Sequence, residues 1–164
     1  MLPTTAQLDQ YVTRCNGYRL RILRLIEIMD SNDNEYHQRA RTRLDLVFFN
    51  RTNILVELRM MISDMDQSED RNTFIDIINT AHGMINDVDH RIRRQLKTLS
   101  TINPLLPSFI THSTDMMIAI IMMAKEKFVN HLCYNQHIGL FYVHKMTMSN
   151  QDMIESYQDI VNAV

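Results

Sequence analysis

The long stretch without proline constrains this chain more than any other feature. No proline occurs between Pro3 and Pro104, a run of 100 residues, so nothing there removes a backbone donor from a long helix. Glycine is also scarce. The 164 residues contain three glycines and three prolines, whereas average usage would give about eleven and about eight. A small β protein needs many turns built from these residues, so the sequence predicts an all-α fold.

Apolar residues recur every three or four positions in three long segments, which is typical of amphipathic helices packed against other helices. The first helix should begin at Thr4 or Thr5 and end in the polar residues 31–34. The second is expected over about 35–64 and the third over about 72–99. Their stripes are Leu8, Tyr11, Cys15, Tyr18, Ile22, Leu25 and Met29; Leu44, Phe48, Leu55, Leu58, Ile62 and Met65; and Phe74, Ile78, Ala81, Ile85, Val88, Ile92, Leu96 and Leu99.

Two features interrupt these stripes. Arg51 falls on the apolar side of the second helix. Because an unpaired buried arginine is strongly destabilising, Arg51 must either meet a carboxylate or lie where the bundle is open. Gly83 lies inside the third helix, where glycine costs about 1 kcal/mol relative to alanine. It either allows close packing or is simply tolerated.

The third helix also carries two acid-before-base pairs at i,i+4 spacing, Asp87 with Arg91 and Asp89 with Arg93. Pairs of this kind stabilise a helix surface by a few tenths of a kcal/mol. Both pairs are therefore expected to support this helix.

Residues 100–113 contain Pro104 and Pro107 and are predicted to form a crossover loop between the halves of the bundle. A fourth helix should start near Ser113 or Thr114. Its segment Met116–Ala124 is apolar on every side, so it should be the most enclosed element. A short C-terminal helix is expected from Ser149. The prediction is thus a single domain over 1–164, a bundle of four to five helices.

Charge and cysteine content restrict the compartment and the class of partner. The formal net charge is −2, with 19 acidic against 17 basic residues, which argues against a strongly basic nucleic-acid binder. Two cysteines are too few for a disulfide scaffold, and no signal peptide is visible at the N-terminus. The longest apolar run has nine residues, about half of what a membrane span needs. We expect an intracellular protein, cytoplasmic or nuclear, without a membrane span.

Catalytic motifs are missing from the sequence. There is no glycine-rich phosphate loop, dinucleotide fingerprint, G-x-S-x-G or HExxH, and no Glu-x-x-His of the kind found in di-iron bundles. Cys133 and His137 are i,i+4 neighbours on a helix, and thiolate with imidazole suits zinc. The favoured alternative is a buried thiol beside partly exposed histidines. The sequence therefore predicts no enzyme, no cofactor and no metal site.

Arginine outnumbers lysine 13 to 4, and guanidinium favours two-point pairing with phosphate or carboxylate. One arginine-rich face is predicted on the first helix and one on the third. They consist of Arg14, Arg21 and Arg24, and of Arg91, Arg93, Arg94 and Lys97. Either face would suit an accessory module that binds phosphate or nucleic acid. Because acids outnumber bases overall, solvated faces with ordinary ion pairs are the favoured alternative.

Methionine is abundant, with thirteen residues. Its flexible thioether fills gaps in cores and also lines adaptable binding surfaces. Core filling is favoured for the central helix. A partner-binding patch is predicted at Met60, Met61, Met146, Met148 and Met153, with contact area added by aromatic residues such as Tyr36, Phe49 and Tyr142.

The leading hypothesis is a non-enzymatic interaction or structural protein. It would act through helix faces, on a protein partner or on a second copy of itself in a homo-oligomer. A small accessory or structural protein of a virus fits the size and the lack of catalytic motifs. The alternative hypothesis is the phosphate- or nucleic-acid-binding module that uses the arginine-rich faces.

Overall fold

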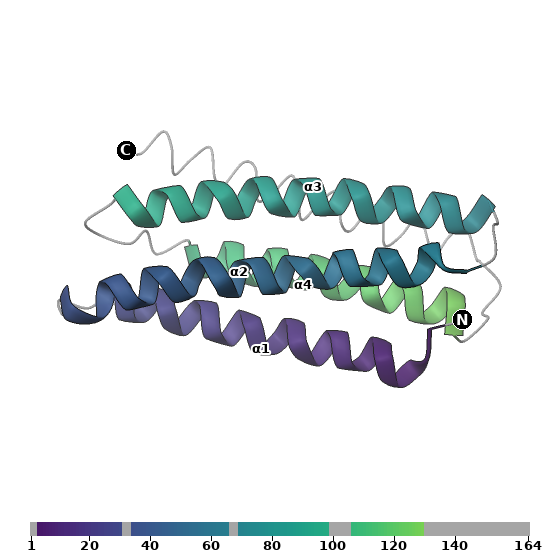
Figure 1. Ribbon diagram of the computed structural model, residues 1–164, viewed down its shortest axis with the longest axis horizontal. Coiled ribbons are helices and arrows are strands. Elements are labelled where there is room, and N and C mark those ends of the chain that lie inside the picture. The colour runs from purple at the N-terminus through teal and green to yellow at the C-terminus, as the bar shows by residue number, and fades with distance from the viewer. Residues whose placement is uncertain (1–2, 31–33, 66–68, 99–105, 130–164) are drawn as a thin grey trace.

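The computed structural model describes residues 3–30, 34–65, 69–98 and 106–129, which form an all-α bundle and confirm the predicted fold class. The helices are α1 (Thr5–Asp30), α2 (Asn34–Ser63), α3 (Glu69–Thr98) and α4 (Leu106–Ala124). A π-helical turn, η1 (Lys125–Val129), continues α4. Consecutive helices run in opposite directions along one axis (Figure 1).

Seen along the bundle axis, the four helices lie at the corners of a square. Close packing joins α1 to α2, α2 to α3, α3 to α4 and α4 to α1, and α4 packs more extensively against α1 than against α3. Helices α2 and α4 therefore face each other across a diagonal, with α4 behind α2 in the view of Figure 1. Buried side chains from all four helices form one hydrophobic cluster.

The predicted start of the first helix is confirmed by a capping box at Thr4. The Gln7 amide donates to Thr4 Oγ1 over 3.2 Å, and the Thr4 amide donates to Gln7 Oε1 over 2.9 Å. This reciprocal pair satisfies two amides that no helical carbonyl can reach. At the end of α2, the Arg71 guanidinium donates to the carbonyls of Ser63 and Met65. These bonds satisfy carbonyl groups at the C-terminal end of the helix.

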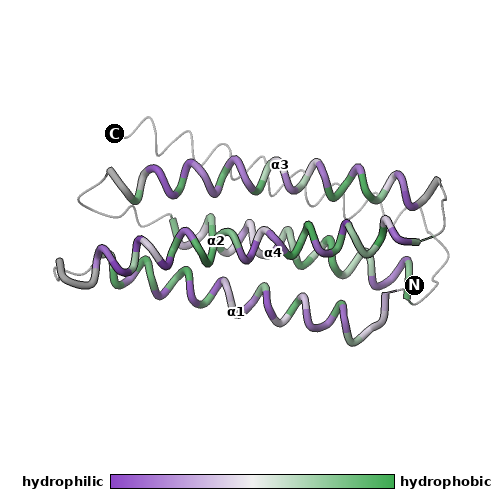
Figure 2. Tube along the Cα trace, viewed as in Figure 1, coloured by the Kyte–Doolittle hydropathy of each residue, from purple (hydrophilic) through white to green (hydrophobic). Residues whose placement is uncertain are grey.

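The predicted apolar stripes form the core. On α3, every described residue of the predicted stripe is buried except Val88, which is half-buried and packs against the cluster. Figure 2 shows polar and apolar residues alternating turn by turn along this helix. The stripes of α1 and α2 behave alike, with Tyr11, Tyr18 and Met65 half-buried at their margins.

The predicted start of the fourth helix is wrong, because α4 begins at Leu106 rather than at Ser113 or Thr114. Pro107 does not break the helix, since it lies in the first turn, where its missing amide hydrogen has no helical partner to lose. The predicted crossover loop is correspondingly shorter. Because α3 ends at the end of the bundle where α4 begins (Figure 1), the connection joins adjacent helix ends.

Helix α4 is the most apolar element. None of its residues from 116 to 124 is exposed. The stretch Leu106–Val129 is long and apolar enough to cross a membrane by length and composition. However, 56% of its most apolar part is buried within the bundle. A core helix of a soluble bundle meets the same criterion, so the absence of a membrane span stays a prediction. The C-terminal helix expected from Ser149 lies outside the described residues.

Gly83 is exposed, and a Cβ atom added there would meet nothing within 4 Å. Close packing is therefore not the reason for this glycine. We expect Gly83→Ala to raise the free energy of unfolding by about 1 kcal/mol through helix propensity. In thermal unfolding followed by circular dichroism, this corresponds to a rise in Tm of about 2–4 °C. An unchanged or lower Tm would show that residue 83 has a contact or a bend that requires glycine.

Candidate interaction surface

A buried polar network at the centre of the bundle holds the side of α2 that carries Arg51 toward the core. The side chain of Arg51 has no exposed surface, and its Nη2 donates to Asp89 Oδ1 on α3 over 2.6 Å. Its Nη1 reaches across the diagonal to Ser113 Oγ and Thr114 Oγ1 on α4, each at 2.9 Å. Of the two predicted alternatives for Arg51, the structure takes the first, a carboxylate partner.

The three hydroxyl groups around this pair also bond to helix carbonyls. Ser113 and Thr114 donate to the carbonyl of Ile110 over 3.2 and 2.7 Å. Thr52 Oγ1 lies 3.0 Å from the Phe48 carbonyl and 3.2 Å from Asp89 Oδ2. The hydroxyl groups would therefore keep a partner if the charged pair were removed.

The predicted i,i+4 ion pair of Asp89 with Arg93 is wrong, because their side chains take other partners. Asp89 is 1% exposed, and burial raises the pKa of its carboxyl group above the ordinary value although the charge of Arg51 lowers it. Arg93 instead donates to the Asp89 carbonyl and lies 3.7 Å from Asp45 of α2. The predicted pair of Asp87 with Arg91 is confirmed, at 3.3 Å.

Cys15 of α1 lies in the same core. Burial raises the pKa of its thiol from 9.0 to about 11, against the lowering effect of nearby arginine charges. The thiol therefore stays protonated at neutral pH, and because only the thiolate is a good nucleophile, Cys15 is not a reactive cysteine. The centre of the bundle is thus packed rather than built for chemistry at Cys15.

The inward position of Arg51 determines what α2 presents to solvent. At 100° per residue, Phe49, Asn53 and Met60 lie about 160–200° around the helix from Arg51. Phe49 and Met60 are 65% and 61% exposed. Arg51 and the buried apolar residues of α2 face inward together, so the opposite side of the helix faces solvent.

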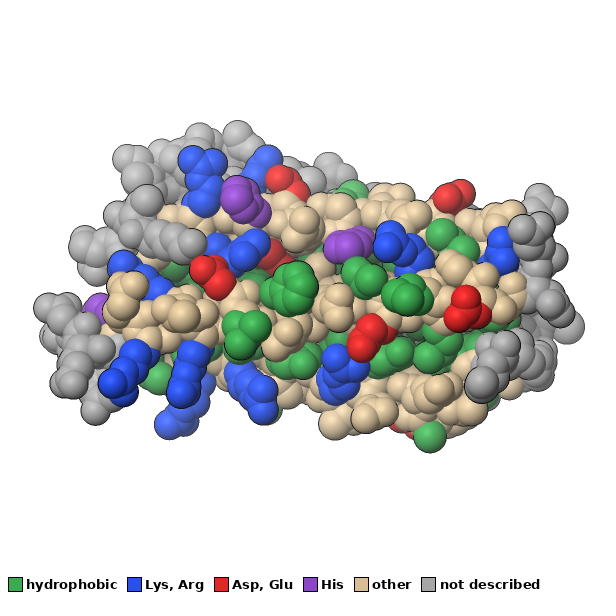
Figure 3. Space-filling model, in the orientation of Figure 1, with side chains coloured by type: hydrophobic (Ala, Val, Ile, Leu, Met, Phe, Trp, Pro, Cys, Tyr) green, Lys and Arg blue, Asp and Glu red, His purple; other side chains and the backbone are tan. Residues whose placement is uncertain are grey.

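We call Leu46, Phe49, Asn53, Val56 and Met60 the outer stripe of α2. Leu46, Phe49 and Met60 are 60–65% exposed, and Asn53 and Val56 are half-buried. The described residues contain only two other exposed large apolar side chains, Leu20 on α1 and Met84 on α3. Figure 3 shows apolar side chains strung along α2 on the face toward the viewer. Phe49 and Met60 were predicted contact residues, whereas Leu46, Asn53 and Val56 were not.

The methionines of the predicted patch separate in space. Met60 belongs to the outer stripe, whereas Met61 is half-buried and packs against the core. Met146, Met148 and Met153 lie outside the described residues, as do Tyr142 and the side chain of Tyr36. The described part of the predicted patch is therefore Met60, joined by Phe49.

The arginine-rich face predicted on α1 is only partly solvent-facing. Arg14 is not on the outer side of the helix, because its guanidinium donates to Glu57 Oε2 of α2 over 2.8 Å and lies over the Tyr11 ring. Arg21 and Arg24 are exposed and carry no ion pair within the described residues. The face therefore consists of two arginines rather than three.

The cluster predicted on α3 does not form one surface. Arg91 and Arg94 are exposed, and Arg91 pairs with Asp87. Arg93 turns toward α2, where its guanidinium lies 5.8 Å from the centre of the Phe48 ring. Lys97 belongs to α3, and its side chain lies outside the described part of the structure.

The metal candidates Cys133 and His137 lie outside the described residues. Within the residues that the structure describes, no group of three or more His, Cys, Asp or Glu side chains is placed to hold a metal ion.

In the part of the chain that the structure describes, fold and surface together define an all-α four-helix bundle with a charged pair at its centre and an apolar stripe on the outside of α2. No protein family, curated protein or solved structure matches this chain.

Proposed function

We propose that this protein is a non-enzymatic interaction protein whose contact surface is the outer stripe of α2. The observation that carries the proposal is the concentration of exposed apolar side chains on one helix face, with Leu46, Phe49 and Met60 each 60–65% exposed. Single exposed apolar residues are ordinary on protein surfaces, whereas a continuous patch typically marks an interaction site.

The chemistry of the stripe suits a helical partner. An exposed aromatic ring and a methionine are the residue types enriched in interface cores. Spacings of three and four residues let a second helix lie along the stripe, as an amphipathic helix does in an apolar groove. The rigid bundle behind α2 means that little conformational entropy would be lost on docking.

A photo-crosslinker tests this proposal. We expect benzoyl-phenylalanine in place of Phe49, in the full chain and in its native source, to give covalent adducts with a protein. The matched control places the same group at Thr80, an exposed position on α3, where we expect none. Adducts at neither position, or equal adducts at both, would contradict the proposal.

A second candidate function rests on the exposed arginines at the end of the bundle where α1 meets α2. Arg21, Arg24, Arg39 and Arg43 are all exposed and carry no ion pair within the described residues. Figure 3 shows basic side chains gathered over this end of the molecule. Such a surface would bind phosphate groups, as in a nucleic-acid accessory module.

This second function predicts binding to a fluorescent DNA duplex that weakens steeply with salt, because phosphate contacts release counterions. We expect Arg21→Glu with Arg24→Glu to abolish it, as measured by anisotropy. Reversal of Arg94 on α3 is the matched control. If the double variant binds as tightly as the wild type, the α1 face plays no part.

A further inference from the structure

We infer that the outer stripe of α2 pairs with the same stripe of a second copy of this chain, the two α2 helices running antiparallel about a twofold axis. The inference rests on the proposed function and names its partner. The stripe residues follow one another at intervals of three, four, three and four. At 100° per residue they fall within an arc of about 80° and extend over about 21 Å of helix.

Four of the five stripe residues pair with one another when one copy is reversed. Positions 49 and 60 lie equally far from the point between residues 54 and 55, and so do positions 53 and 56. A twofold axis through that point places Phe49 opposite Met60 of the partner subunit and Asn53 opposite Val56 of the partner subunit. Each contact then occurs twice, as an isologous interface requires. A thioether beside an aromatic ring is itself a favourable contact.

Charge decides between antiparallel and parallel pairing. Arg39 and Arg43 are exposed in the N-terminal half of α2, and Asp64 is exposed just after its C-terminus. Neither Arg43 nor Asp64 has an ion pair within the described residues. The midpoint of positions 43 and 64 lies within about one residue of the same axis, so the antiparallel arrangement brings Arg43 beside Asp64 of the partner subunit. A parallel arrangement would place Arg43 level with Arg43 of the partner subunit and Asp64 level with Asp64 of the partner subunit, so neither would meet its opposite charge.

The central polar residue has a place in this arrangement. Asn53 is the one polar side chain within the stripe. A single polar residue in an apolar helix seam lowers affinity but fixes register, because every shifted alignment leaves its amide facing apolar groups. Because the seam is short, we expect a dissociation constant at the micromolar end of the range for protein pairs.

Sedimentation velocity of the full chain over a range of concentrations tests the inference. We expect a monomer–dimer equilibrium, and we expect Phe49→Glu to weaken it at least tenfold. Arg94→Glu on α3 is the matched charge control and should leave it unchanged. A chain that stays monomeric at every concentration would overturn the inference. This holds if residues 130–164 cover the stripe, and equally if another protein does. Photo-crosslinked adducts of position 49 with that other protein would then still uphold the proposed function.

Cross-linking tests the direction of the helices independently. Arg43→Cys and Asp64→Cys are made separately in a Cys133→Ser chain, and Cys15 is too buried to react. When the two are mixed with a short bismaleimide, we expect a dimer joining position 43 to position 64. Neither variant alone should cross-link, because along the helix axes two copies of position 43 would lie about 35 Å apart and two copies of position 64 about 29 Å apart. Cross-links of 43 to 43 and 64 to 64 would instead mean parallel pairing and overturn the arrangement.

Discussion

Replacement of Asp89 by asparagine is expected to lower the free energy of unfolding by about 3–5 kcal/mol, because it leaves the buried charge of Arg51 without a counter-charge. Arg51 has no exposed surface, and its remaining partners are the neutral hydroxyl groups of Ser113 and Thr114. Urea unfolding with linear extrapolation measures the loss as a lower midpoint concentration at an unchanged slope.

The matched control is Asp87→Asn, two residues earlier on the same helix. Asp87 is 60% exposed and pairs with Arg91 at the surface, where an ion pair contributes at most about 1 kcal/mol. We expect its free energy of unfolding to change by less than about 0.5 kcal/mol. If the two asparagine variants proved equally stable, the buried pair would not have the structural weight that its geometry indicates.

The double variant Arg51→Met with Asp89→Val should behave very differently. Burial raises the pKa of Asp89, because it is costly to take a carboxylate out of water. Removal of both charges relieves that cost, and the hydroxyl groups keep their carbonyl partners. We expect the double variant to equal or exceed the wild type in stability. A double variant less stable than Asp89→Asn would contradict this interpretation.

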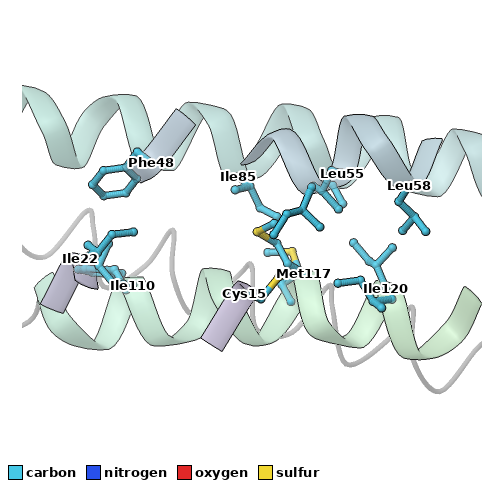
Figure 4. Packing of buried hydrophobic residues seen from close by; sticks show 14 of the residues in the cluster. Cys15, Ile22, Phe48, Leu55, Leu58, Ile85, Ile110, Met117 and Ile120 are labelled. Carbon is cyan, nitrogen blue, oxygen red and sulfur yellow. The ribbon is translucent and has the colours of Figure 1, made fainter. Parts of the chain in front are cut away.

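Phe48→Ala is expected to cost about 3–5 kcal/mol of unfolding free energy, as large-to-small changes of a buried aromatic residue do. Phe48 is 1% exposed and points toward Ile22 and Ile110 in the core (Figure 4). Its ring also lies within 5.4 and 5.8 Å of the guanidinium carbons of Arg51 and Arg93, so the change removes two cation–π contacts as well.

The adjacent residue is the control for this prediction. Phe49 is 65% exposed, so Phe49→Ala should change the free energy of unfolding by less than about 0.5 kcal/mol. The same urea titration on both variants makes the comparison. A large loss at position 49 would mean that its ring packs against the bundle, and the outer stripe would then be part of the fold rather than a surface for a partner.

Periodicity predicted the helices well because packing against other helices imposes it. The described residues of the predicted α3 stripe all pack into or against the core, and the second helix was predicted within one residue at each end. The start of α4 was missed because Pro107 resembled a helix breaker. Proline disrupts the interior of a helix but not its first turn, and nothing local in the sequence distinguishes the two positions.

The partners of Arg51 show where sequence reasoning stops. The stripe on α2 predicted that a buried arginine needs a carboxylate, but which carboxylate depends on how the helices are turned against each other. Asp89 lies three residues before Ile92 and four after Ile85, so its position on the apolar face was visible in the sequence. The i,i+4 spacing from Asp89 to Arg93 instead predicted a partner on the same helix.

The outer stripe of α2 was missed for a related reason. The five residues of the outer stripe follow the same three-and-four spacing as the core stripe, on the opposite side of the helix. When a helix has two apolar sides, their residues appear in the sequence as one wide apolar stripe. The buried position of Arg51 identifies which side points inward.

The reach of Arg51 across the bundle has a consequence for the order in which the protein is made. A ribosome that has released only α1, α2 and α3 has produced Arg51 and Asp89 but not Ser113 and Thr114, 62 and 63 positions after the arginine. The nascent chain can form the α1–α2 hairpin early. Water must fill the place of α4 in the bundle until α4 emerges. The bonds from Arg51 to α4 therefore form late in synthesis. Chains truncated before residue 113 should be readily cleaved by proteases.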